Sequence, residues 1–148
     1  MYLELITEEN ARLYFESFDD CSKTIAIGSA EGYIGNNQQL ITVIKVYDGF
    51  QKSGVGFELF YRVFEYFSQI QPILTIVGTW SNDSEFSYCE GGESTNLKVF
   101  KTLTSDHFTK EEAALNTPTG KWAKKLGYDK VKVLIIREDQ VTVEFSQG

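Results

Sequence analysis

The segment from Val46 to Gly56 carries residues that could hold a phosphorylated ligand. Gln51, Gly54 and Gly56 have the spacing Gln-x-x-Gly-x-Gly, and Lys52 adds a positive charge among them. If a helix starts here, its N-terminus presents backbone N–H groups and the positive end of the helix dipole, and the glycines let a ligand approach that backbone closely. The pattern therefore predicts a diphosphate-binding turn. The alternative is a glycine-softened strand-to-helix turn that binds nothing.

The two elements that must position this turn are clear in the sequence. Residues 40–47 are rich in β-branched side chains and predict a strand. The residues from 54 to 69 predict a helix, because the polar ones form one narrow stripe at helical spacing: Glu58, Arg62, Glu65 and Gln69. The remaining side chains of this helix are largely apolar or aromatic, and we expect them to pack against a sheet.

A second informative segment runs from Asn116 to Tyr128. It predicts a helix that ends on Lys124 and Lys125, where positive charge suits the helix dipole, with Gly127 as a left-handed cap. Two short strands follow, at residues 131–137 and 141–145. A short turn joins them.

The two segments resemble motif A and the last helix of the GNAT superfamily of N-acetyltransferases. Asp48 departs from the pattern where proline is usual, and Thr119 departs from it where alanine is usual. The matching residues are Val46, Gln51, Gly54 and Gly56 in the first segment, and Asn116, Trp122, Lys125, Gly127 and Tyr128 in the second.

The resemblance implies a single α/β (α+β) domain over residues 1–148, with a mixed, twisted sheet of about six or seven strands and helices on both faces. The strand at 73–80 would run parallel to 40–47 and splay away from it, and the pantetheine of acetyl-CoA would lie between them. Ligands of open α/β sheets bind beyond the carboxyl ends of strands, which points to the same place. The implied acetyl-CoA-binding residues are Val46, Gln51, Lys52, Ser53, Gly54, Val55, Gly56 and Asn116.

The N-terminal third, which supplies one wall of the acceptor site in the family, is expected to be trimmed or built differently here. We predict a strand at 2–6, a helix from Thr7 to about Phe18, and short strands at 23–28 and 31–35. The family usually has two helices after its first strand, whereas this segment has room for one.

We expect residues 81–115 to form an insertion beside the acceptor site. Ser94 is expected to cap a short helix over 96–103. The insertion begins where the strand at 73–80 ends, at Trp80. Trp80 and Tyr47, at the ends of the two splayed strands, either line the acceptor pocket or belong to the core. The first half of the insertion is acidic and would favour a cationic acceptor. The alternative is a solvated acidic loop without a role in binding. The acidic residues are Asp83, Glu85, Glu90 and Glu93.

Acetyl transfer needs a base for the amine and an acid for the leaving thiolate. Family members often use a tyrosine as that acid, but Ala123 stands at its position, and the strand at 40–47 lacks the glutamate base that many members place there. The candidate catalytic residues are Glu85 and Glu93 as bases and Tyr88 as the acid, and further candidates are Glu90, His107 and Tyr128.

The favoured function is transfer of acetyl from acetyl-CoA to a primary amine of a small molecule or peptide, and this amine is expected to be cationic. The alternative is a weak or inactive domain of this fold that binds CoA or a protein partner, and a third reading is a structural module without a CoA site. The sequence does not distinguish a monomer from a homodimer.

Composition excludes other classes. The 148 residues carry a net charge of −7, which argues against a nucleic-acid partner. No apolar run has the length of a membrane span, no metal site is expected, and two cysteines are too few for a disulfide framework. A cytoplasmic protein is therefore expected.

Overall fold

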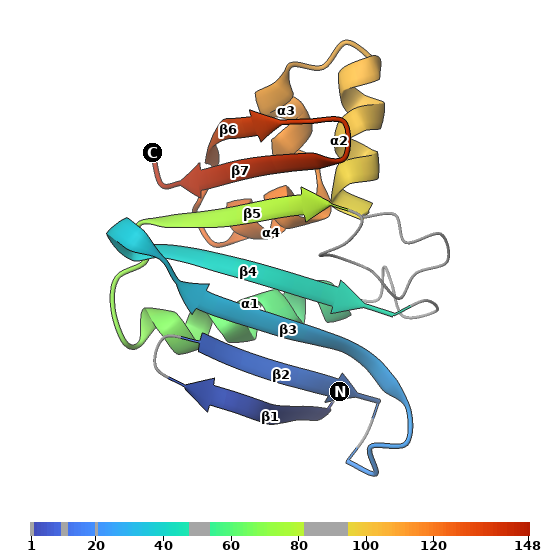
Figure 1. Cartoon of the computed structure of the whole chain (residues 1–148), viewed down its shortest axis with the longest axis vertical. Coiled ribbons are helices and arrows are strands. Elements are labelled where there is room, and N and C mark those ends of the chain that lie inside the picture. The colour runs from blue at the N-terminus through green and yellow to red at the C-terminus, as the bar shows by residue number, and fades with distance from the viewer. Residues whose placement is uncertain (1, 10–11, 20, 48–53, 82–94) are drawn as a thin grey trace.

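The computed structural model describes residues 2–9, 12–19, 21–47, 54–81 and 95–148, which form one sheet and four α-helices (Figure 1). A 3-10 turn, Asn36–Gln38, precedes the fourth strand. In chain order the elements are β1 (Tyr2–Glu9), β2 (Arg12–Phe18), β3 (Ala26–Ile34), β4 (Gln39–Val46), α1 (Val55–Ser68), β5 (Thr75–Ser81), α2 (Thr95–Ser105), α3 (Lys110–Leu115), α4 (Pro118–Lys125), β6 (Lys130–Ile136) and β7 (Gln140–Ser146).

The sheet has seven strands in the order β1-β2-β3-β4-β5-β7-β6. All neighbouring strands are antiparallel except β4 and β5, which are parallel and joined through α1. The mixed α/β sheet predicted from the sequence is thus confirmed.

Strands β4 and β5 separate after a short paired stretch. Their register covers only Gln39 to Ile41 of β4 against Thr75 to Val77 of β5. Beyond this point β4 continues beside β3 as far as Val46, and β5 continues beside β7 as far as Ser81. The predicted splay between the two parallel strands is therefore present, and it opens toward their carboxyl ends.

The predicted helix from Thr7 to Phe18 is wrong, because residues 12–18 form strand β2 in a hairpin with β1. Side chains of β2 alternate between the two faces of the sheet, and Leu13 and Ser17 are fully buried. The two strands predicted at 23–28 and 31–35 are one continuous strand, β3. Tertiary pairing on both sides of β2 outweighs the local helix signal of Glu8, Glu9 and Asn10.

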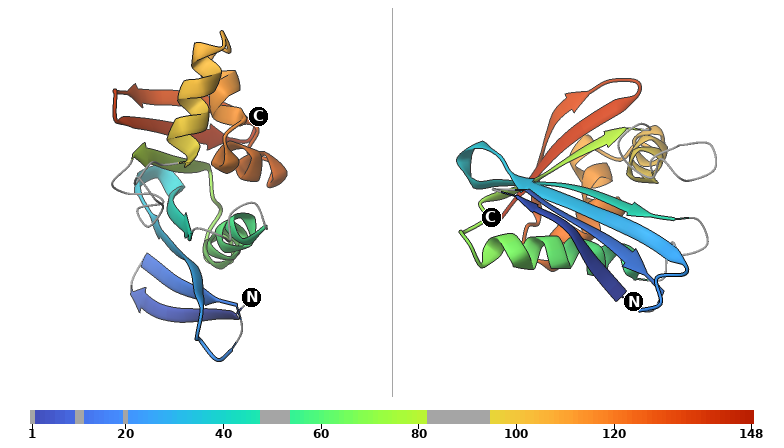
Figure 2. Two further views of the ribbon diagram at one scale, coloured as in Figure 1. Left: turned by 90° about the vertical axis from the view of Figure 1, so that its right-hand side faces the viewer. Right: turned by 60° about the horizontal axis from the view of Figure 1, so that its bottom comes forward.

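All four described helices pack on one face of the sheet (Figure 2). This face carries Leu40, Ile76 and Phe145, which are paired across β4, β5 and β7. The expectation of helices on both faces is not met in the described part of the chain, because the segment expected to supply an N-terminal helix forms β2 instead.

The opposite face of the N-terminal strands carries charged pairs in place of a helix. Arg12 forms an ion pair with Glu31 and lies 5.0 Å from the centre of the Tyr33 ring, and Lys23 pairs with Glu4. Such a polar face can remain in water on one side of an antiparallel sheet.

Helices α2 and α3 lie in the segment between β5 and α4. The helix predicted at 96–103 is confirmed as α2, whereas α3, which begins with a capping box made by Thr109 and Glu112, was not predicted. None of the described helices combines the length and apolar character that a membrane span requires.

The alternation in β2 gives a test of the fold. Leu13→Ala should lower the free energy of unfolding by about 2–5 kcal/mol, because it removes a fully buried side chain. Glu16→Ala, on the open face of the same strand, should cost less than about 1 kcal/mol. Urea unfolding followed by circular dichroism measures both, and equal costs would contradict the strand assignment.

Candidate functional site

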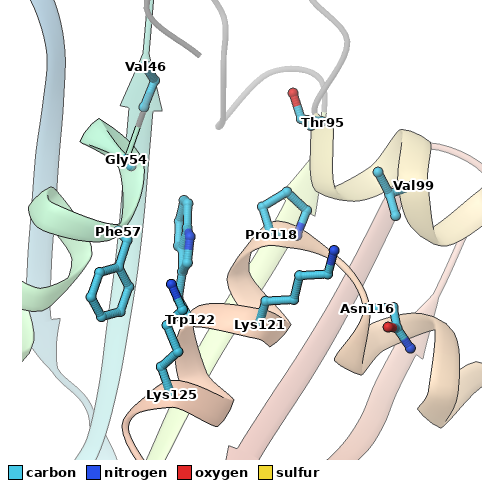
Figure 3. A pocket seen from close by; sticks show the side chains of 11 residues that line it. Val46, Gly54, Phe57, Thr95, Val99, Asn116, Pro118, Lys121, Trp122 and Lys125 are labelled. Carbon is cyan, nitrogen blue, oxygen red and sulfur yellow. The ribbon is translucent and has the colours of Figure 1, made fainter. Parts of the chain in front are cut away.

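A cavity of about 460 Å³ lies where the end of β4, the start of α1, and helices α2 and α4 meet (Figure 3). Its walls are mainly apolar. The lining residues are Val46, Gly54, Gly56, Phe57, Thr95, Val99, Asn116, Pro118, Lys121, Trp122 and Lys125.

The N-terminus of α1 opens onto this cavity with its backbone donors available. Gly54 is the N-cap residue, with a left-handed φ of 86°, and no described side chain caps the helix. The first intrahelical bond runs from the N–H of Glu58 to the carbonyl of Gly54. The N–H groups of the preceding first turn therefore have no acceptor within the helix, and they favour an anion together with the helix dipole.

The N-terminus of α4, by contrast, is satisfied from within the protein. Pro118 has no N–H, and the N–H of Thr119 donates to Oδ1 of Asn96 at 2.9 Å. The N–H of Gly120 donates to Oγ1 of Thr117, and that of Lys121 donates to the Thr117 carbonyl. Compared with α4, the N-terminus of α1 therefore has more donors to offer a ligand within the described part of the chain, and the first residue of α2, Thr95, also lines the cavity.

Two lysines give the cavity its charge. Lys121 and Lys125 lie one turn apart on α4, both are exposed, and both line the cavity. The Nζ of Lys125 is 4.5 Å from the centre of the Phe57 ring, so its ammonium group lies over the first turn of α1. No carboxylate is found among the described lining residues, and the cavity is therefore suited to an anion.

The structure places four of the predicted cofactor-binding residues around the cavity: Val46, Gly54, Gly56 and Asn116. The Nδ2 of Asn116 donates to the carbonyl of Glu112, so this amide also closes the end of α3. Val55 lies between the two glycines but does not line the cavity. Gln51, Lys52 and Ser53 lie outside the described residues, as do the catalytic candidates Glu85, Tyr88 and Glu93, together with Asp48, Asp83 and Glu90.

Several other candidates are placed away from the cavity. His107 is exposed just after α2, and Trp80 is fully buried against Phe100 and Phe145 in the core. Tyr47 is half-buried and does not line the cavity. Of the two readings open for Trp80, the structure supports core packing.

Tyr128 is a structural residue. It is buried, its ring packs edge-on against Phe64, and its hydroxyl donates to the carbonyl of Ile73 at 2.5 Å. Burial raises the pKa of the Tyr128 hydroxyl above its usual value. Ala123, at the position of the family's tyrosine, is fully buried, so a larger side chain there would overpack the core.

Sequence reasoning missed part of the cavity wall. The sequence analysis did not identify Lys121, Phe57 or Pro118 as lining residues. Two of them had a local signal: Lys121 lies four residues before Lys125 on the same helix face, and Pro118 marks the helix start. The contribution of Thr95 and Val99 depends on how α2 packs onto α4, which no local pattern specifies.

Comparisons with known proteins bear on the fold. No protein-family model matches the sequence, and no curated protein matches it. Among solved structures, an aminoglycoside 6'-N-acetyltransferase complexed with coenzyme A is similar, with a TM-score of 0.54 and 14% identity over 92% of this chain and 73% of that chain.

Two further structures have TM-scores of 0.51. One is the PaiA N-acetyltransferase of Thermoplasma acidophilum in complex with coenzyme A, 12% identical over 92% of this chain. This chain spans 61% of the length of that protein. The other is a chimera of the spermidine N-acetyltransferase SpeG from Vibrio cholerae and hSSAT, 15% identical over 94% of this chain and 70% of that chain. These likenesses confirm the predicted fold.

The role of Tyr128 can be tested through stability. Tyr128→Phe should lower the free energy of unfolding by about 1–3 kcal/mol, because the buried Ile73 carbonyl loses its donor. The folded-state pKa is raised, so the unfolded chain releases this proton first as the pH increases. The difference between wild type and variant should therefore be full below pH 10.0, the usual pKa of tyrosine, and shrink above it. A constant difference from pH 7 to 11 in urea titrations would contradict this role.

Proposed function

We propose that this chain, which has the fold of the GNAT N-acetyltransferases, binds acetyl-CoA and transfers its acetyl group to a primary amine. The observation that carries the proposal is the N-terminus of α1, which no described side chain caps and which lines an apolar cavity at the end of β4 together with Lys121 and Lys125. Helix donors and lysines together suit a diphosphate, and apolar walls suit an uncharged arm.

In this proposal the diphosphate of CoA binds at the first turn of α1, and its pantetheine runs toward the gap between β4 and β5. The amine nitrogen attacks the thioester carbonyl carbon, the C–S bond breaks, and the amine loses a proton while the thiolate gains one. Glu85 or Glu93 would act as the base and Tyr88 as the acid. If Tyr88 does not serve, water protonates the thiolate, since Ala123 cannot donate and the Tyr128 hydroxyl is engaged with Ile73.

A cationic amine is the proposed acceptor. The acidic segment 82–94 is joined to the end of β5 at Ser81 and to Thr95 in the cavity wall, and it carries Asp83, Glu85, Glu90 and Glu93. Two of the compared structures are named for acetylation of spermidine and of aminoglycosides, which are themselves cationic amines. Attraction between carboxylates and such an amine would weaken with salt.

The second candidate is a domain of this fold that binds CoA without turnover. It is favoured by the described lining residues, which include no tyrosine, histidine or carboxylate. Under this reading the cavity holds the cofactor, and segment 82–94 supplies no catalytic group.

Charge reversal on α4 tests cofactor binding. The double variant Lys121→Glu/Lys125→Glu should weaken acetyl-CoA binding by at least about tenfold, because two cations beside the bound phosphates become anions. Lys124→Glu is the matched control, since Lys124 is exposed on the same helix but does not line the cavity. Isothermal titration at low and moderate salt measures both variants, and equal affinities would remove the lysines from the site.

Turnover separates the two candidates. Thiol release from acetyl-CoA should be faster with a polyamine or aminoglycoside than with a neutral amine, and the preference should fall as salt is added. Replacing the four acidic residues of segment 82–94 by amides should raise KM for cationic amines and leave acetyl-CoA affinity nearly unchanged. Binding of acetyl-CoA without thiol release across the amine panel would favour the second candidate.

A further inference from the structure

We infer that Trp122 is a cofactor-positioning residue, and that the two motif glycines have different tasks. Gly54 leaves room for the ligand, whereas Gly56 leaves room for the Trp122 indole. This inference rests on the proposed function, because the ligand it concerns is acetyl-CoA.

Gly56 has no free space on its side-chain side. A Cβ atom at this position would lie 2.5 Å from Cζ2 and 2.7 Å from Cη2 of Trp122, and 3.5 Å from Cγ2 of Val46. Both ring distances are far below van der Waals contact. Helix α1, strand β4 and helix α4 therefore meet at Gly56, and the Trp122 indole fills the space that a side chain at Gly56 would occupy.

Gly54 is the opposite case. A Cβ atom there would have no neighbour within 4 Å among the described residues, and the residue is required instead for its left-handed backbone, with a φ of 86°. Gly54 lines the cavity. The side-chain direction is thus open at Gly54 among the described residues, whereas at Gly56 it is filled by Trp122, which leaves only the backbone of Gly56 to line the cavity.

The indole is also held from the α1 side. Its ring centre is 5.6 Å from that of Phe60, which is fully buried in the core. Trp122 is itself only half-buried, and its remaining surface lines the cavity between α1 and α4 (Figure 3). It is thus a rigid spacer with one side in the core and one side toward the ligand.

The two lysines are adjacent to this spacer in the sequence. Lys121 precedes Trp122 directly, and Lys125 follows it within one helical turn. A single diphosphate can bind both the first turn of α1 and these lysines only if the two helices keep a fixed separation. The Trp122 indole between Gly56 and α4 sets that separation.

The experiment uses the full chain with acetyl-CoA as the probe, and measures affinity by isothermal titration and stability by thermal unfolding. Trp122→Leu should weaken binding by about tenfold, and Trp122→Phe, which keeps an aromatic ring, by less than about threefold. Gly56→Ala should weaken binding and lower Tm. The double variant Gly56→Ala/Trp122→Leu should bind more tightly and unfold at a higher temperature than Gly56→Ala, because the smaller side chain leaves room for the new Cβ.

Trp80→Phe is the matched control, since Trp80 is the other tryptophan and lies fully buried outside the cavity. It should lower Tm and leave acetyl-CoA affinity unchanged. The inference is overturned, while the proposed function stands, if folded Trp122→Leu binds acetyl-CoA as well as wild type does. The same holds if the effects of the two substitutions on affinity and Tm simply add in the double variant. If wild type binds no acetyl-CoA, the proposed function is overturned with it.

Discussion

The separation of β4 from β5 is the constraint on which the rest of the structure depends. Two parallel strands that part after Ile41 and Val77 each need a second partner, and each has one, β3 for β4 and β7 for β5. The apolar side chains beyond the parting point must then be covered by helices rather than by a neighbouring strand. Helices α1 and α4 do this, and their contact through Phe60 and Trp122 bridges the two halves of the sheet. The cavity lies where this bridge ends.

The N-termini of α1 and α4, which both border the cavity, differ in how their backbone donors are used. Both helices point a dipole toward the same region, but Asn96 and Thr117 satisfy the donors of α4, whereas α1 begins on a glycine that has no side chain to offer. An anion gains hydrogen bonds only where donors are otherwise unmet. Helix α2 therefore contributes to the cavity by closing the N-terminus of α4 through Asn96.

The sequence predicted the C-terminal two-thirds of the fold well, because strands 40–47 and 73–80, the helix from 54 to 69 and the final hairpin have strong local patterns and short connections. It failed at residues 12–18, where acidic residues and Asn10 suggested a helix start; the alternation of Arg12, Leu13, Tyr14 and Phe15 was the overlooked strand signal. The glycine-bearing turn was found for a local reason, its spacing. Trp122, Phe57 and Val99 come together only through packing of distant elements, so local periodicity could not identify them as one wall.

The place of β5 also constrains the order in which the chain can fold. Strands β1 to β4 form an antiparallel meander of neighbours in sequence, which can assemble as soon as they leave the ribosome. Residues 75–81, however, pair along their full length with residues 140–146 and with β4 over only three positions. During synthesis β5 must therefore remain an apolar strand with one unsatisfied edge until β7 has been made. Such late, non-local closure is slow and exposes the nascent chain to misassociation, so yield in the cell should depend on chaperones or translation speed more than the final stability suggests.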